Sequence, residues 1–342
     1  MHLQKLKEVY SRNENLIQYM KNQSQTQANT TEQIMISYDF QAGTYMEGYY
    51  QDPSEYDQTA QRLAEIILAK SISGTVVEAG VGEASILVPL LNELDAHKKP
   101  YFQSVYGFDI SWSRIKAAKA FAKAQGQDKI QFFMGDLLNI PIRDNSFDLV
   151  YTNHAIEPND GREKEILEEL YRVTRKYLIL REPCYEFAGQ EARARMKKHG
   201  YVTKLYQSAQ ELGYEIETYG LFHSSPEDRN PSGLMIIRKE CSMEEEQERD
   251  GLFACPVSQK NMKKYENPMG EADYYCPESM LVYPIIQGVP CSTANNAVVA
   301  TKYLEDFDQK ANAEQKGRAK WQHTKKVING NGGWWNYLKS AS

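Results

Sequence analysis

The feature that most constrains this chain is the alternation of two kinds of apolar segment between Thr75 and Pro183. Five short runs have the length of strands: TVVEAG, QSVYGFD, KIQFFMG, SFDLVYTN and YLILREP. Between them lie three longer segments that repeat apolar residues every three or four positions, as helices do: ASILVPLLNEL, SRIKAAKAFAKAQ and EKEILEELYRV. Strands that alternate with helices pair in parallel and are covered on both faces. The alternation therefore predicts an α/β fold built on a mostly parallel sheet.

The pattern changes after Pro183. A helical segment, EARARMKKHGYVTKLYQSAQELG, is followed by two more strand-like runs, YEIETYGLFH and GLMIIRK. The segment SSPEDRNPS between these runs is rich in turn residues, so we expect the two runs to form an antiparallel pair at one edge of the sheet. The prediction is a sheet of seven strands, one of them antiparallel.

A chain of 342 residues is too long for one small core and suits two units. Asp52 and Pro53 predict the start of a helix that ends near Ile67, ahead of the sheet. We expect five parts: an N-terminal helical lid (1–70), the sheet domain (71–240), an acidic linker (241–250), a second small domain (251–308) and a basic tail with three tryptophans (309–342).

Composition indicates a cytoplasmic protein. Apolar residues make up 41% of the chain and charged residues 25%, which is ordinary for a globular protein. No run approaches the roughly 18 apolar residues of a membrane-spanning helix, so no membrane partner is expected. The five cysteines, an odd number, do not suggest a secreted disulfide framework. A net charge of -6 argues against a nucleic-acid footprint over the whole surface, but it leaves room for a local basic patch.

The turn after the first predicted strand contains Gly80 and Gly82 and lies where an open α/β sheet binds its ligand. We expect the next helix to start near Glu83. A dinucleotide-binding loop would need a third glycine where Ser85 stands. Glu78 and Glu83 also surround the turn with negative charge, which disfavours a pyrophosphate and tolerates a cationic ligand.

Four segments in order resemble class I S-adenosylmethionine-dependent methyltransferases: EAGVGEA after the first strand, GFDIS after the second, MGDLLNIP after the third, and DNSFDLVYTNHAIE. The resemblance covers about Gly74 to Lys239. It implies a Rossmann-like fold with S-adenosylmethionine as cofactor, Asp109 as acceptor for the ribose hydroxyls and Asp136 beside the adenine amino group. The donor-contacting residues that it implies are Glu78, Gly80, Val81, Gly82, Asp109, Ile110, Asp136, Leu137 and Asn153. A sulfonium carries its own electrophile, so no metal is expected for the chemistry.

The segment YDFQAGTY, ahead of the sheet, resembles the N-terminal lid that many members of this family fold over the donor. Tyr38, Gln41 and Tyr45 are the donor contacts that we expect from it, with Gly43 as a flexible point. The alternative is that these aromatic residues only pack in the core.

Several residues are candidates for the group that takes the acceptor's proton. His154 follows the fourth strand, with Asn153 and Glu157 nearby, and histidine suits proton transfer near neutral pH. The alternative is that Asn153 and His154 only line the methionyl carboxylate. Glu182 and Tyr185 follow the fifth strand and are further catalytic candidates at the same edge of the sheet.

The segments FACPVS and YYCPESMLVYPIIQGVPCS resemble a small zinc-ribbon-like family. Its eukaryotic member is the activating subunit of several tRNA, rRNA and release-factor methyltransferases. A zinc ribbon needs two C-x-x-C knuckles, but Ser258 and Ser279 replace the second cysteine of each. Cys255 and Cys276 remain, with Cys291 as a third metal candidate. We favour a metal-free, degenerate zinc-ribbon-like α+β domain that packs against the first domain or shapes its substrate mouth.

The sequence therefore predicts a methyltransferase that transfers a methyl group to an oxygen or nitrogen of a small molecule or saccharide. A first alternative is a tRNA or protein substrate, with the second domain and the basic tail as a docking surface. A second alternative is a regulatory protein that binds the donor without catalysis.

Overall fold

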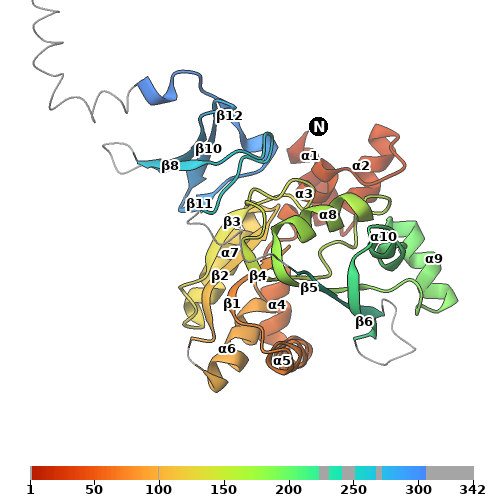
Figure 1. Cartoon of the computed structure of the whole chain (residues 1–342). Coiled ribbons are helices and arrows are strands. Elements are labelled where there is room, and N and C mark those ends of the chain that lie inside the picture. The colour runs from red at the N-terminus through yellow and green to blue at the C-terminus, as the bar shows by residue number, and fades with distance from the viewer. Residues whose placement is uncertain (1, 99, 223–230, 241–250, 267–271, 306–342) are drawn as a thin grey trace, which may run out of the picture.

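The computed structural model describes residues 2–98, 100–222, 231–240, 251–266 and 272–305 (Figure 1). The acidic linker (241–250) and the basic tail (309–342) predicted from the sequence lie outside the described residues. None of the described helices combines the length and the apolar character that are required to cross a bilayer.

The centre of the molecule is a seven-stranded sheet of order β3-β2-β1-β4-β5-β7-β6. The strands are β1 (Gly74–Ala79), β2 (Phe102–Asp109), β3 (Gln131–Met134), β4 (Phe147–Asn153), β5 (Thr174–Pro183), β6 (Glu215–Leu221) and β7 (Ser232–Arg238). Only β7 runs against its neighbours, β5 and β6. The predicted sheet, with its one antiparallel strand, is confirmed.

Helices cover both faces of the sheet because its strands bury side chains alternately on each side. Val76 and Leu149 pack with α5 (Ser54–Ala69), α6 (Leu87–His97) and α7 (Trp112–Ala124). Val77 and Val150 pack on the other face with α8 (Glu163–Val173) and α10 (Leu205–Glu211). A further helix, α9 (Gln190–His199), lies beside α10 at the β6 edge (Figure 1).

The expected helix start near Glu83 is wrong, because α6 begins at Leu87. Ala84 has a φ of 61°, in the left-handed region, which a continuous right-handed helix excludes. The residues between Gly80 and Leu87 form turns instead. This leaves the Glu83 side chain available for another element.

The predicted N-terminal helices are present as α1 (Leu3–Ser11), α2 (Leu16–Ser24), α3 (Thr31–Phe40) and α4 (Thr44–Gln51). Thr30 and Gln33 form a capping box at the start of α3. Near the end of α3, the Asp39 carboxylate accepts hydrogen bonds from the Ser111 hydroxyl (2.7 Å) and the Ser113 N–H (3.0 Å). Asp39 therefore fastens the N-terminal helices to the start of α7.

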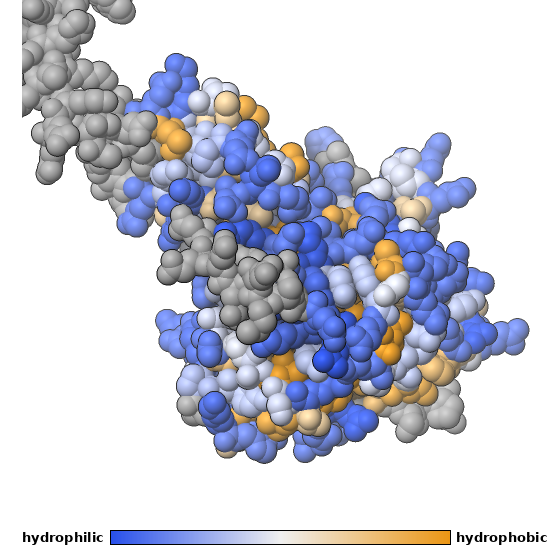
Figure 2. Space-filling model, viewed as in Figure 1, coloured by the Kyte–Doolittle hydropathy of each residue, from blue (hydrophilic) through white to orange (hydrophobic). Residues whose placement is uncertain are grey.

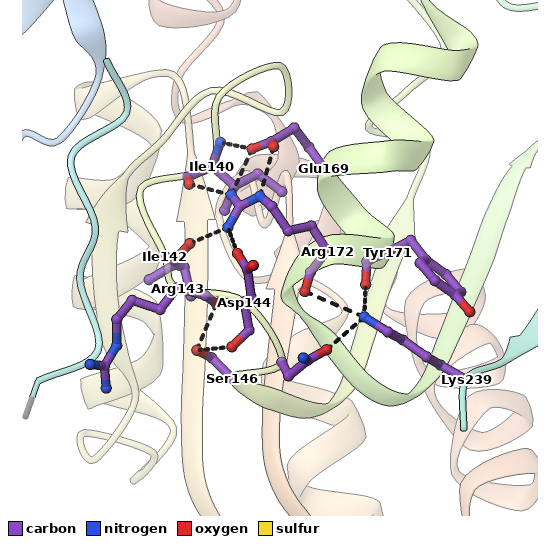
Figure 3. Close-up of polar contacts among 10 residues, drawn as sticks. Ile140, Ile142, Arg143, Asp144, Ser146, Glu169, Tyr171, Arg172 and Lys239 are labelled. Carbon is purple, nitrogen blue, oxygen red and sulfur yellow. Dashed lines mark hydrogen bonds and ion pairs between the residues drawn. The ribbon is translucent and has the colours of Figure 1, made fainter. Parts of the chain in front are cut away.

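The loop between β3 and β4 is held by Arg172 of α8 (Figure 3). Its guanidinium donates to the carbonyls of Ile140 (2.9 Å) and Ile142 (2.7 Å) and to the Asp144 carboxylate (2.8 Å). Glu169 accepts from Arg172 Nε (2.7 Å) and from the Ile140 N–H (2.7 Å). These bonds satisfy loop carbonyls that no strand pairs, so they fix the path of the loop.

A small second sheet lies against the β3 edge, above α7 in Figure 1. It comprises β8 (Lys263–Glu266), β9 (Ala272–Cys276), β10 (Leu281–Ile286), β11 (Val289–Pro290) and β12 (Val298–Val299). Cys291 forms a parallel bridge with Met134 of β3, and Phe253 forms an antiparallel bridge with Ile142. Phe253 and Cys291 are buried in the same apolar clusters as the main sheet. The second sheet therefore extends the core of the first, and the face of it seen in Figure 2 is hydrophilic with several apolar patches.

Asp148 at the start of β4 ties three strands together. Its buried carboxylate accepts from the Thr75 N–H of β1 (2.9 Å), from Arg175 Nε of β5 (3.0 Å) and from Lys176 Nζ (2.9 Å). Burial acts to raise the pKa of Asp148, but these partners outweigh it and lower the pKa to about 2. Because the pKa is lowered on folding, the carboxylate stabilises the fold at neutral pH and loses this effect as the pH falls from about 5 toward 2.

We predict that Asp148→Asn lowers the free energy of unfolding at pH 7 by about 2.5 kcal/mol, the value of a shift of roughly two pKa units. Urea unfolding followed by circular dichroism between pH 7 and pH 3 measures the effect. The difference from wild type should shrink as the pH falls, and a difference independent of pH would contradict the assignment. Asp128→Asn, at an exposed turn, is the matched control.

Candidate functional site

A cavity of about 530 Å³ lies at the carboxyl ends of the central strands. The strand order reverses between β1 and β4, and this is the point at which open α/β sheets bind ligands. The volume is within the range of small-molecule sites. The predicted residues that line the cavity are Tyr38, Tyr45, Glu78, Gly80, Val81, Gly82, Asp109, Ile110, Asp136, Leu137, Asn153, His154 and Glu157.

The turn between β1 and α6 forms one wall of the cavity. Gly80 has a φ of 74°, and a Cβ placed on it would lie 2.2 Å from the Cβ of Ala155, in the loop after β4. Glycine is therefore required at position 80 for two loops to approach each other. The N–H groups of Gly80 and Val81 both donate to the Phe108 carbonyl (2.8 Å each), which fixes the turn against β2.

Three carboxyl groups line the cavity: Glu78 and Asp109 are buried, and Asp136 is half-buried. Asp109 accepts hydrogen bonds from the N–H groups of Gly82 (3.0 Å) and Ser111 (2.8 Å), and Asp136 accepts from Leu138 N–H (3.0 Å). Burial raises the pKa of both aspartates. Burial also raises the pKa of Glu78 to about 8, although the hydrogen bond that Glu78 accepts from Tyr151 acts to lower it. The cavity is therefore lined with oxygen acceptors suited to hydroxyl and amino donors.

Glu83 fixes the N-terminal lid above the glycine turn. Its fully buried carboxylate accepts hydrogen bonds from the N–H groups of Gly43 and Met46, each at 2.8 Å, at the start of α4. These are N–H groups that a helix leaves without an internal partner, and a carboxylate there also complements the helix dipole. The position of Tyr45 over the cavity follows from this contact.

Arg114 is a cavity residue that the sequence analysis did not single out. Its guanidinium lies 4.8 Å from the centre of the Tyr38 ring and 4.3 Å from that of Tyr45, and Nε donates to the Tyr38 carbonyl (3.0 Å). Its Nη2 is buried without a hydrogen-bond partner among the described residues. Arg114 lies in the first turn of α7, where a cation interacts unfavourably with the helix dipole. This unfavourable placement is the sequence signal that could have identified Arg114 as a site residue.

The turn after β4 places His154 at the cavity with both ring nitrogens bonded. Nδ1 lies 3.1 Å from Glu157 Oε2, and Nε2 lies 2.6 Å from the hydroxyl of Ser232, the first residue of β7. Ser232, Arg181, Arg195 and Tyr201 also line the cavity and were not predicted. No local sequence pattern marks these four, because they reach the site from β5, β7 and the α9 region.

Three predicted residues do not line this cavity. Glu182 is buried and accepts hydrogen bonds from the N–H groups of Ala155 (3.0 Å) and Ile156 (3.1 Å), so it holds the loop that carries His154. Burial raises the pKa of Glu182 to about 7. Tyr185 packs with α9 instead, under the guanidinium of Arg193. Gln41 lines an adjacent hollow of about 320 Å³.

The three cysteines proposed for a metal do not form a set. Cys255 Sγ lies 3.4 Å from the Ser279 hydroxyl, and Cys276 Sγ lies 3.7 Å from that of Ser258. Cys291 contacts the Val289 carbonyl instead, beside β3. Burial opposes ionisation of Cys255, but hydroxyl hydrogen bonds lower its pKa to about 7. No group of three or more His, Cys, Asp or Glu residues in the described part of the chain is arranged to hold a metal.

A family comparison places residues 76–177, the segment from β1 into β5, in a family described as a methyltransferase domain. The chain contains a methyltransferase domain. The lining of the cavity fits the chemistry of S-adenosylmethionine, the methyl donor that the sequence resemblance implies. Carboxylates face it for hydroxyl and amino groups, glycine exposes backbone at the turn, and the free Nη2 of Arg114 suits a carboxylate.

Two curated proteins illustrate the sequence similarity of the methyltransferase domain. Norajmaline N-methyltransferase of Rauvolfia serpentina is 41% identical over 76 residues, which is 22% of this chain and 26% of that protein. Demethylmenaquinone methyltransferase of Geobacillus stearothermophilus is 32% identical over 71 residues, 21% of this chain and 30% of that protein. The chain thus matches between a quarter and a third of the length of these relatives.

Solved structures are similar at lower identity. Magnesium protoporphyrin IX methyltransferase from Synechocystis PCC 6803, with bound S-adenosylhomocysteine, is 19% identical, with 54% of this chain and 83% of that chain covered and a TM-score of 0.42. The [4+2]-cyclase SpnF is 14% identical, with 53% and 81% covered and a TM-score of 0.43. Neither likeness bears on the reaction or the substrate of this chain.

We predict that Glu83→Gln loosens the lid, because an amide cannot accept two charge-assisted hydrogen bonds as the carboxylate does. The amide hydrogens of Gly43 and Met46 should exchange at least about tenfold faster, and the affinity for S-adenosylhomocysteine should fall by a similar factor. Hydrogen exchange and titration calorimetry measure the two effects. Glu47→Gln, an exposed change on α4, is the control. Equal exchange rates of the Gly43 and Met46 amides in the two variants would refute the role of Glu83.

Proposed function

We propose that the protein is an S-adenosylmethionine-dependent methyltransferase that methylates a nitrogen or oxygen of a small molecule. The observation that carries the proposal is one cavity whose lining includes the glycine turn, Asp109 and Asp136 together with the His154 turn. Donor and acceptor would meet inside it, beneath the lid. The relative norajmaline N-methyltransferase from Rauvolfia serpentina, named for a small-molecule acceptor, supports this class of acceptor.

The donor would lie along the carboxyl ends of β1, β2 and β3. Asp109 would accept the ribose hydroxyls, Asp136 the adenine amino group, and Arg114 Nη2 would bind the methionyl carboxylate. When bound, S-adenosylmethionine supplies an electrophilic methyl group, and the electron pair of the broken carbon–sulfur bond remains on sulfur. The contribution of the chain is to orient the acceptor, exclude water and take up the released proton.

The acceptor would occupy the part of the cavity bounded by His154, Ser232, Arg181, Arg195 and Tyr201. The lid helices α3 and α4 cover the site, and Tyr38 and Tyr45 are part of its lining. A cavity of about 530 Å³ favours a small acceptor over a folded nucleic acid or protein. A saccharide hydroxyl or a secondary amine would meet the same polar groups.

We propose that residues 251–308 form a metal-free relative of the zinc-ribbon-like family. A zinc ribbon would have four metal-binding thiolates at these positions, whereas this chain pairs the thiols of Cys255 and Cys276 with serine hydroxyls. The module would support the methyltransferase domain through its bridges to β3 and to the loop that follows Asp136. Its position beside this loop supports a role in holding the adenine side of the site.

We predict that Asp109→Asn lowers the affinity for S-adenosylhomocysteine about 10- to 100-fold, the effect of losing charge-assisted hydrogen bonds worth roughly 1.5–3 kcal/mol. Titration calorimetry measures this affinity. Asp128→Asn makes the same chemical change at an exposed turn and should bind like wild type. Unchanged binding by Asp109→Asn would refute the placement of the donor.

A further inference from the structure

The environment of His154 restricts how this residue can handle a proton. Its two ring nitrogens are both engaged, Nδ1 by Glu157 (3.1 Å) and Nε2 by Ser232 (2.6 Å), and all three residues line the cavity. A proton that moved from an acceptor directly to His154 would first require one of these bonds to break. The oxygen of Ser232, in contrast, has lone pairs beyond its bond to the ring.

The chemistry of the partners sets the direction of the hydrogen bonds. An ionised carboxylate only accepts, so Glu157 requires the proton of a neutral imidazole to be on Nδ1. Nε2 is then an acceptor, and the Ser232 hydroxyl donates to it. The ring is held in this orientation by an unusual backbone: His154 has a φ of 53°, and its N–H donates to the Arg181 carbonyl (2.8 Å). Strained backbone of this kind persists where neighbouring structure enforces it.

We infer that Ser232 is the catalytic residue that contacts the acceptor and takes its proton, and that His154 is the base that acts through Ser232. This inference rests on the proposed methyltransferase function. As the acceptor is methylated, its N–H or O–H bond breaks, and the electron pair of that bond stays on the acceptor atom. The proton bonds to Ser232 Oγ while the hydroxyl proton of Ser232 moves to His154 Nε2.

The product of this transfer is an imidazolium with both N–H groups paired. Nδ1–H still donates to Glu157, and Nε2–H now donates to Ser232, so the positive charge lies beside a carboxylate. The ring releases the proton to solvent water after the product leaves. Glu157 is therefore a positioning residue, which selects the tautomer and stabilises the cation.

The direct test is the tautomer of His154, which needs no acceptor. Full-length protein labelled with ¹⁵N-histidine is saturated with S-adenosylhomocysteine, and His154 is assigned among the six histidines by its loss in His154→Gln. We expect the Nδ1–H tautomer in wild type and a displaced Nε2 resonance in Ser232→Ala. An Nε2–H tautomer in the wild-type protein would overturn the inference, because Nε2 would then donate to Ser232.

The kinetic test uses any small amine or alcohol that the wild-type enzyme methylates. Ser232→Ala should lower kcat about 100- to 1000-fold with little change in the KM for S-adenosylmethionine, whereas Ser232→Thr, which keeps the hydroxyl, should recover most of the rate. Equal impairment of both variants, or a wild-type kcat in Ser232→Ala, would overturn the inference. Ser104→Ala, at the opposite end of the sheet in β2, is the control. The two tests can fail separately. If no acceptor is methylated, the proposed function is wrong, whereas the tautomer of His154 tests the direction of its hydrogen bond with Ser232 in either case.

Discussion

The buried carboxylate of Glu83 is the contact on which the position of the N-terminal helices at this site depends. Glu83 lies in the turn that follows β1, and its carboxylate accepts hydrogen bonds from two N–H groups of the lid at 2.8 Å. Because the turn and the lid share this carboxylate, the glycines that approach the ligand and the aromatic rings above it are positioned together. Asp39 adds a second attachment, between α3 and α7. The lid is therefore an integral wall of the cavity.

A second constraint holds two further loops at the cavity. Arg172 hydrogen-bonds to the loop after Asp136, as Figure 3 shows, and Phe253, which precedes the small sheet, forms a bridge with Ile142 of the same loop. Glu182 in turn fixes the loop that carries His154. Side chains that each make several hydrogen bonds to one loop are costly to displace, so each loop has one preferred position. Such preorganisation is what transfer between two bound molecules requires.

Site residues that lie at the carboxyl ends of strands could be predicted from the sequence. Asp109 and Asp136 could be found because parallel strands bring their carboxyl ends to one edge. Glu182 was assigned a catalytic role from the same rule, but the rule does not tell which way a side chain faces, and Glu182 points to backbone N–H groups. Ser232 is 78 positions from its partner His154, and their contact follows from the pairing of β5 with β7. Only tertiary structure reveals such a pair.

The central claim is that one cavity brings a methyl donor and a small acceptor together. Incubation of the wild-type protein with S-adenosylmethionine and a library of small amines, alcohols and saccharides, followed by mass spectrometry, tests it most directly. The account predicts that a member of the library gains the mass of one methylene group while S-adenosylhomocysteine accumulates in equal amount. Saturating donor binding without any methylated product, across acceptors small enough to enter the cavity, would contradict it.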